Sequence, residues 1–554
     1  MRHVVLKYFT IILFSLSLSF VFSQQRASDV VMGKLDSDRA SWNALYYKLH
    51  IHISDTSNSI FGTHDLYLKA LKATDSIRID LQYPMQISQI TYNTKPLNFI
   101  KTAYYYKILF PIKADSVYKL QLAFNGIPPQ AQNPPWDGGI VRTLDNNNRP
   151  WISMACQGIA GSIWYPCKDH MSDEPDSMEI TLHVPKYLKG ISNGTLKAIN
   201  ITDNTAQYTW KVLSPINNYN IIPNVGHYIN IKDTFQGRAG VLPLHYWVID
   251  YDSLPAVNQF KTQVKSMLRC FEDWFGPYPF YKDGYKLIQT PFLGMEHQSG
   301  IAYGNGFSNG YLGEDLSKTG WGTTWDYILV HESGHEWFGN NISVKDVADN
   351  WIHEGFTCYS ENLFVEYLYG KQAGADYVLG LRANIKNTEP IIAVYNINQS
   401  PDNDIYYKGA NILHYLRQIV NSDSLWKACL RHLNTTFKHQ TVTSIQVETE
   451  MSTFLKLNLS LFFDQYLRHP AIPKIEYYIR HNTLFYRSQN TITNLILPVR
   501  FLVQSANSKK TDEAVWVNVS ANWQHVKLKS DYYLKPDKNC YVQFINKKKK
   551  LFVF

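Results

Sequence analysis

The segment His331-Glu332-Ser333-Gly334-His335, followed after eighteen residues by Glu354, constrains this chain more than any other feature. Histidines four positions apart lie on one face of a helix. Two imidazole nitrogens and one carboxylate oxygen form the ligand set of a catalytic zinc, with a fourth position left for water. The spacing predicts one Zn²⁺ per chain, held by His331, His335 and Glu354. Glu332 is then placed to accept a proton from that water.

Both ligand-bearing segments have the apolar spacing of helices. We expect Thr323 or Thr324 to cap the first helix and Gly339 to lie at its end. The second helix is expected from about Asp346 to Gly370.

Glu361 lies seven residues, or two helical turns, beyond Glu354 on the same face. It is a candidate to orient a ligand histidine from outside the coordination shell. A glutamate at the solvent surface is the alternative.

Other zinc motifs are tested by their spacing. A metzincin has Gly three and His six residues after the second motif histidine, where this chain has Phe338 and Asn341. The gluzincin pattern remains, in which the third ligand is a Glu on the next helix. An ordinary buried helix would leave Glu332 and Glu354 without a purpose near an apolar face.

Three further segments occur in a fixed order around the zinc motif: Cys156-Gln157-Gly158 through Cys167, Leu293-Gly294-Met295-Glu296-His297, and Tyr406-Tyr407-Lys408-Gly409-Ala410. They resemble the Gln-rich substrate loop, the Gly-x-Met-Glu-Asn exopeptidase motif and the Tyr-Glu-Lys-Gly-Ala stretch of one zinc aminopeptidase family. That family contains aminopeptidase N and leukotriene hydrolase, the gluzincin aminopeptidases. The resemblance is to the exported bacterial type and covers about residues 40 to 470.

The resemblance implies a role for each matching residue. Glu296 would bind the free α-amine of the substrate, with Gln157 as a second ligand. Tyr406 would donate a hydrogen bond to the oxyanion of the tetrahedral intermediate. Gly294 and Met295 would line the same substrate site. The structural alternatives are loop sequence around Glu296, a packing tyrosine and a structural amide at Gln157.

His297 stands where the family has Asn. An imidazole is larger than an amide and ordinarily titrates near neutral pH. We therefore expect His297 to tune the substrate subsite rather than abolish it.

The residues and the resemblance together favour a zinc aminopeptidase that removes single residues from peptides with a free N-terminus. Glu332 would act as general base. A gluzincin endopeptidase is the first alternative, and it would not need Glu296. Epoxide hydrolysis, found in one branch of the family, is another. A catalytically dead peptide-binding scaffold is a further alternative, although its relatives lack metal ligands that are all present here.

The chain of 554 residues is long enough for several domains and is expected to be a multidomain α+β protein. Strand-like alternation indicates an antiparallel N-terminal β domain over residues 24–243, which the resemblance implies is saddle-shaped. Helical patterns dominate residues 244–470, the catalytic domain, which the resemblance implies is thermolysin-like. Alternation returns in residues 471–554, which are expected to form a small β-sandwich.

Residues 1–23 have the pattern of a secretory signal, with basic residues before an apolar run and a cleavage site before Gln24. The product is expected to be exported, periplasmic or secreted, with no membrane span after cleavage; an uncleaved anchor is the alternative. Six cysteines remain, and their spacing favours isolated buried thiols. The net charge of +8 comes from dispersed residues without a nucleic-acid signature.

Overall fold

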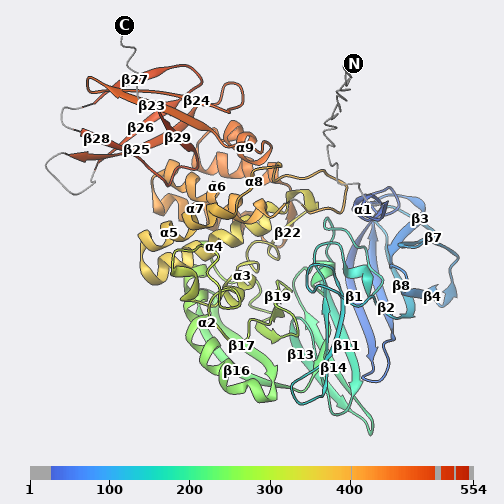
Figure 1. Cartoon of the computed structure of the whole chain (residues 1–554). Coiled ribbons are helices and arrows are strands. Elements are labelled where there is room, and N and C mark those ends of the chain that lie inside the picture. The colour runs from blue at the N-terminus through green and yellow to red at the C-terminus, as the bar shows by residue number, and fades with distance from the viewer. Residues whose placement is uncertain (1–26, 401, 506–512, 529–531, 548–554) are drawn as a thin grey trace, which may run out of the picture.

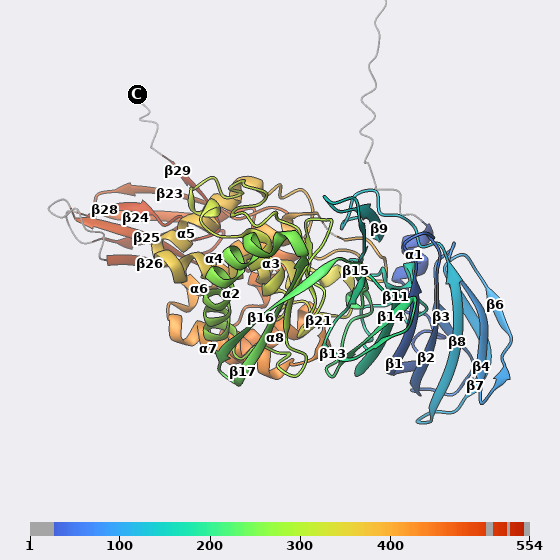
Figure 2. The ribbon, with the colours of Figure 1, turned by 90° about the horizontal axis from the view of Figure 1, so that it is seen from below.

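The computed structural model describes residues 27–400, 402–505, 513–528 and 532–547. A β-rich N-terminal part, a largely helical middle and a C-terminal group of strands follow one another (Figures 1 and 2). The expected signal peptide, residues 1–23, lies outside the described residues. Within the described ranges, no helix is long and apolar enough to cross a membrane. All six cysteines are buried and unpaired, which confirms the expectation of isolated thiols.

The largest sheet of the N-terminal part has eight strands in the order β13-β14-β11-β1-β2-β8-β4-β5. Their bounds are β1 Trp42–Ile53, β2 Ile60–Ala70, β4 Gln86–Tyr92, β5 Lys95–Pro96, β8 Val117–Gly126, β11 Ser177–Pro185, β13 Thr195–Ile201 and β14 Thr205–Val212. Alternate residues such as Tyr47, Leu49 and Ile51 are buried, as a half-covered sheet requires. The expectation of an antiparallel domain is wrong at one place, because β1 and β11 pair in parallel. Between β2 and β11 the chain also forms strands of two smaller sheets, and β11 then joins the large sheet again.

Those two smaller sheets complete the N-terminal part, with strand orders β12-β15-β10-β9 and β3-β7-β6. Their bounds are β3 Thr74–Asp80, β6 Phe99–Lys101, β7 Tyr105–Ile112, β9 Gly139–Leu144, β10 Pro150–Ala155, β12 Lys189–Ile191 and β15 Asn224–Gly226. Gln157 lies in the loop that follows β10, so the sheet that contains β10 fixes the position of this residue.

The middle part begins with a five-stranded sheet of order β16-β17-β18-β20-β19. Its strands are β16 Tyr228–Gly237, β17 Gly240–Ile249, β18 Tyr285–Gln289, β19 Gly294–Met295 and β20 Ile301–Tyr303. A boundary at residue 243 would cut β17, and the change of sheet lies between β15 and β16. β16 and β17 alternate like the strands before them, so the sequence pattern could not separate them from the N-terminal part.

Helices fill the rest of the middle part: α2 Ser253–Phe275, α3 Tyr327–Gly334, α4 Trp351–Tyr369, α5 Lys371–Gly380, α6 Asp404–Val420, α7 Asp423–Thr436, α8 Ser444–Leu455 and α9 Ser460–Leu467. A short parallel pair, β21 Ile342–Val344 and β22 Gln440–Val442, lies among them. Residues 351–365 of α4 are all buried, because α2, α3, α5 and α6 all pack against this helix. α4 is therefore the central helix of this part.

Two small sheets, of order β27-β24-β23-β29 and β26-β25-β28, form the C-terminal part. Their strands are β23 Lys474–Arg480, β24 Thr483–Gln489, β25 Leu497–Ser505, β26 Glu513–Val519, β27 Gln524–Lys527, β28 Tyr532–Pro536 and β29 Gln543–Asn546. The Phe501 ring of β25 lies 5.3 Å from Tyr477 of β23 and 5.5 Å from Phe544 of β29, measured between centroids. Aromatic side chains thus join the two sheets.

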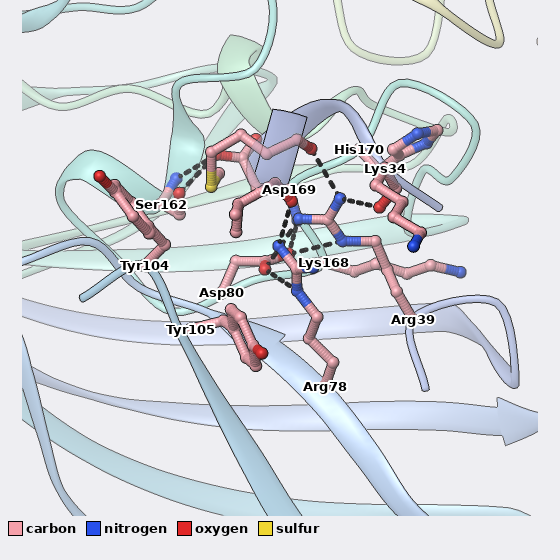
Figure 3. Close-up of polar contacts among 12 residues, drawn as sticks. Lys34, Arg39, Arg78, Asp80, Tyr104, Tyr105, Ser162, Lys168, Asp169 and His170 are labelled. Atoms are coloured by element: carbon pink, nitrogen blue, oxygen red, sulfur yellow. Dashed lines mark hydrogen bonds and ion pairs between the residues drawn. The ribbon is translucent and has the colours of Figure 1, made fainter. Parts of the chain in front are cut away.

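A buried ion cluster ties the N-terminal segment, which begins with α1 Ala27–Gly33, to the first β domain (Figure 3). The Asp80 carboxylate accepts hydrogen bonds from Arg39 at 2.8 Å and from Arg78 at 2.7 Å. Arg39 also donates to the carbonyl of Met32 at 2.7 Å. The amide of Asp169 donates to Asp80 at 2.9 Å, which brings in the loop that carries Gln157.

Removing the central carboxylate should strongly destabilise the fold. In an Asp80→Ala variant the buried Arg39 guanidinium loses its counter-charge, whereas Arg78 keeps its ion pair with Asp36 at 2.6 Å, and the loss of one buried partner costs roughly 3–5 kcal/mol. Thermal unfolding followed by circular dichroism should show a markedly lower midpoint. Lys48→Ala, which removes the partly exposed Lys48–Glu179 ion pair, is the control and should cost less than about 1 kcal/mol. Equal midpoints for the two variants would contradict a structural role of the cluster.

Candidate metal and substrate site

The first ligand-bearing helix is shorter than expected. α3 spans only Tyr327–Gly334, and its N-cap is Asp326, whose side chain accepts from the amide of Leu329 at 3.2 Å. The expectation of Thr323 or Thr324 as the cap is wrong, because Thr323 closes a separate short 3₁₀ helix. The carboxylate of Asp326 provides both the cap and a favourable charge at the helix start.

The predicted ligand atoms converge on one point. The Nε2 atoms of His331 and His335 are 3.3 Å apart. One carboxylate oxygen of Glu354, from the first turn of α4, lies 3.6 Å from His331 Nε2 and 3.3 Å from His335 Nε2. All three residues are at most 5% exposed. The structure therefore brings together the whole predicted ligand set.

The hydrogen bonds behind the ligands show which ring nitrogens carry protons. His335 Nδ1 lies 3.0 Å from the carbonyl oxygen of Phe338, which can only accept, so this nitrogen is the donor. His331 Nδ1 lies 2.7 Å from a carboxylate oxygen of Glu361 and is assigned as a donor in the same way. When both rings are neutral, as metal binding requires, the two Nε2 atoms present lone pairs to each other and to Glu354. Three lone pairs at this separation fit a bound cation, and an N₂O donor set suits zinc.

Glu361 is fully buried, so the alternative of a surface glutamate is wrong. One of its oxygens contacts His331, and the other accepts from the Tyr377 hydroxyl at 2.6 Å. A carboxylate behind a ligand histidine fixes the ring and raises its basicity. The geometry is the one expected for a residue that orients His331.

A close helix contact brings Tyr406 to the ligands. A Cβ added at Gly409 of α6 would lie 2.7 Å from the Cα of Gly355 in α4, so no larger residue fits between these helices. The contact places the Tyr406 ring 6.0 Å from that of His331, with the rings nearly parallel. Burial, with Glu354 and Glu296 nearby, raises the pKa of Tyr406 well above its usual value. The phenol is thus held protonated as a hydrogen-bond donor.

Glu332 faces the same space from α3. Burial raises the pKa of Glu332 to about 7, against the opposing effect of His331 and His335. Strand β19 lies over it, and a Cβ at Gly294 would sit 3.0 Å from a Glu332 carboxylate oxygen and 2.6 Å from Ile328. Glycine is therefore required at position 294 if β19 is to approach α3 this closely.

Glu296 extends from the end of β19 toward the ligands. Its oxygen accepts from the Tyr219 hydroxyl at 2.9 Å, and its backbone carbonyl accepts from Asn340 at 2.8 Å. Glu296 is 5% exposed, and its second carboxylate oxygen has no hydrogen-bond partner among the described residues. Oxygens of Glu296 and Glu332 and a nitrogen of His335 lie within 4.8 Å of one another.

His297 does not behave as expected from the sequence. It is fully buried, and burial lowers its pKa to about 4, so the expectation that it titrates near neutral pH is wrong. Its Nε2 lies 3.1 Å from the carbonyl oxygen of Cys156, the residue before Gln157. It is absent from the cavity walls described next. Its contact is with the backbone of the Gln157 loop.

A cavity of about 380 Å³ joins these side chains. Its walls include the three ligands and several of the other predicted site residues: Gln157, Gly294, Met295, Glu296, Glu332 and Tyr406. The N-terminal part supplies Pro135, Trp136 and Gln157, and the middle part supplies the rest. The site therefore lies between these two parts of the chain.

Several residues at the site were missed by sequence reasoning. Tyr219 bonds Glu296, Trp136 lines the cavity, and the Thr357 hydroxyl lies 3.2 Å from His335 Nδ1. Tyr219 and Trp136 come near the ligands through the packing of distant segments, which no local pattern reports. Thr357 lies one helical turn after Glu354 in α4, and this spacing could have identified it.

Comparisons with known proteins agree with this geometry. Residues 260–466 match the model of the peptidase family M1 domain. The chain is 22% identical to mouse (Mus musculus) endoplasmic reticulum aminopeptidase 1 over 414 residues, 70% of this chain and 44% of the relative. It is 21% identical to leukotriene A-4 hydrolase of Xenopus laevis over 470 residues, 78% of this chain and 73% of the relative.

The chain thus spans less than half the length of the mouse aminopeptidase. Among solved structures, an M1 zinc metallopeptidase from Deinococcus radiodurans shares the fold with a TM-score of 0.66 at 21% identity. That alignment covers 78% of this chain and 94% of the other.

Replacing the carboxylate behind His331 should weaken metal binding. In Glu361→Gln an uncharged amide replaces the carboxylate that orients the ring, and zinc affinity should fall by roughly 10–100-fold. Competition with a zinc chelator followed by metal analysis measures this change. Glu314→Gln, at an exposed position, is the matched control. Unchanged zinc affinity in Glu361→Gln would contradict the assigned role.

Proposed function

We propose that this chain, which belongs to the M1 family of gluzincin aminopeptidases, is a zinc-dependent aminopeptidase that removes single residues from the free N-terminus of peptides. The observation that carries the proposal is the position of the buried Glu296 carboxylate beside the three-ligand cluster and Glu332. A solved relative is described as bound to a Tyr-Ser-Ala substrate, which supports a peptide substrate here.

Glu296 would set where the substrate begins. A buried carboxylate with one oxygen held by Tyr219 leaves the other free for a cationic amine. Pairing an ammonium with this oxygen places the first peptide bond of the substrate over the ligand cluster. Gln157, in the wall of the same cavity, would be the second ligand of the amine.

Glu332 would move the proton. When bound by His331, His335 and Glu354, zinc lowers the pKa of water and polarises a carbonyl group. Glu332 lines the cavity next to these ligands and would accept the proton of the attacking water. It would then return the proton to the leaving amine, as a group that acts first as base and then as acid.

Tyr406 would stabilise the oxyanion. Its phenol stays protonated, its ring stacks 6.0 Å from that of His331, and Glu354 is close to it. A donor fixed by helix packing before substrate arrives needs no reorganisation during reaction. Tyr407 also lines the cavity, but its ring pairs with the ring of Tyr406 and not with that of His331.

An endopeptidase with the same metal is the second candidate, and it would have no use for a buried carboxylate at the amine position. Export to the periplasm or the medium, based on residues 1–23, remains a proposal that accompanies the function.

Removing the proposed base should abolish turnover while sparing the metal. Glu332→Gln keeps the size of the side chain but cannot accept a proton, so kcat should fall by roughly 10²–10⁴-fold. Steady-state hydrolysis of leucine p-nitroanilide measures the loss, and zinc content of the variant should match that of the wild type. Near-normal kcat in a zinc-loaded variant would refute the role of Glu332.

Glu296→Ala should weaken the cleavage of substrates that have a free amine. The loss of a charged hydrogen-bond partner is expected to lower kcat/KM for leucine p-nitroanilide by about 10–100-fold. N-acetyl-leucine p-nitroanilide, assayed with the wild type and the variant, is the control. Both proteins should cleave it far more slowly than the wild type cleaves leucine p-nitroanilide. An acetylated substrate cleaved as fast as the free amine would support the endopeptidase instead.

A further inference from the structure

A second cavity, of about 350 Å³, adjoins the metal site. Trp136, Gln157 and Glu296 line both cavities. On the proposed function, a substrate whose amine pairs with Glu296 lies where the cavities meet. With its first carbonyl toward the metal ligands, such a substrate would have the second cavity open to its N-terminal side chain.

The walls of the second cavity carry negative charge only. Of the described residues that line it, the charged ones are Asp29, Asp137 and Glu296, and none is Lys or Arg. The Asp29 carboxylate has no side-chain hydrogen bond or ion pair to the described part of the chain. Asp137 uses one oxygen to accept from the amides of Gln132 and Asn133, which leaves its other oxygen for a ligand.

A buried histidine in the same walls offers a hydrogen-bond donor to a ligand. His353 is 2% exposed, and its Nε2 accepts from the amide of Val344 at 3.0 Å. The proton of this imidazole is therefore on Nδ1, which has no acceptor within the described residues. The neutral ring adds no positive charge, and a cavity water can satisfy its donor.

The segment that carries Asp29 is held firmly in place. The amide of Asn398 donates to the Asp29 carbonyl at 2.9 Å. A Cβ at Gly33 would lie 2.3 Å from the nitrogen of Asn398, so α1 touches the loop that leads to α6. At its other side, Arg39 of the ion cluster binds the carbonyls of Met32 and Lys34. The carboxylate thus stands on a fixed support.

We propose that the second cavity binds a positively charged N-terminal side chain, Lys or Arg, and that Asp29 is a specificity-determining residue for it. With Glu296 paired to the α-amine, the carboxylates of Asp29 and Asp137 remain without a cation, and they attract such a side chain and repel Asp or Glu. An uncharged side chain would leave the carboxylates without a counter-charge. The proposal rests on the proposed function for the orientation of the substrate.

Kinetics on the full chain test the substrate preference. The wild type should hydrolyse arginine and lysine p-nitroanilides with kcat/KM roughly tenfold above leucine p-nitroanilide, and glutamate p-nitroanilide least. Asp29→Asn should lower the arginine-to-leucine ratio by about fivefold, as expected for one partly exposed ion pair. Asp29→Lys should lower it further.

Asp115→Asn is the matched control, because Asp115 has an 87% exposed side chain in the first β domain. It should leave the arginine-to-leucine ratio as in the wild type. Equal kcat/KM for arginine and leucine substrates in the wild type would overturn the proposal. An equal ratio in the Asp29→Asn and Asp115→Asn variants would overturn the role of Asp29.

Binding separates this proposal from the proposed function. Isothermal titration of zinc-loaded Glu332→Gln protein with L-argininamide and L-leucinamide measures affinity without turnover. Argininamide should bind about tenfold tighter, and Asp29→Asn added to this protein should reduce that difference. If no substrate is hydrolysed by the wild type, the proposed function fails, whereas equal affinities for the two amides would overturn the charge preference.

Discussion

The site depends on three lone pairs that face one another, those of His331 Nε2, His335 Nε2 and a Glu354 oxygen, all within 3.6 Å. The two imidazoles are each aimed by a contact behind them: Glu361 for His331 and the Phe338 carbonyl for His335. Against the effect of burial, the Glu354 carboxylate holds the pKa of His331 well above its usual value and also raises the pKa of His335, so protons on the imidazoles hold the three side chains together when no metal is bound. The packing of α3 on α4 keeps the cluster away from solvent, and residues 351–365 of α4 are all buried.

The remaining chemistry is divided between two parts of the chain. The middle part holds the ligands, Glu332 and Tyr406, whereas the N-terminal part contributes Gln157 and the Tyr219 hydroxyl that bonds Glu296. The Asp80 cluster links the N-terminal segment with the loop after Gln157 through the Asp169 amide (Figure 3). The same cluster therefore supports both the amine end of the site and the wall that carries Asp29.

Local sequence patterns predicted the features that are fixed by short intervals along the chain. The ligand set follows from the four-residue interval in α3, and Glu361 follows from two turns of α4, because both intervals are fixed by helix geometry. The helix N-cap at Asp326 was missed because the nearby Thr323 and Thr324 also belong to a residue type that caps helices. His297 was misjudged because its pKa depends on burial beneath the Gln157 loop, and the parallel pairing of β1 with β11 arises between segments more than a hundred residues apart.

The contact between Gly355 and Gly409 has a mechanical consequence. Backbones this close leave no room for α4 and α6 to slide or tilt against each other, so Glu354 and Tyr406 form one rigid unit. A change in the width of the cleft must then come from the opposite side, where the N-terminal β part carries Gln157 and Tyr219. Motion of the N-terminal part would therefore change the contacts with the substrate amine, while the distance between Glu354 and the Tyr406 phenol stays constant.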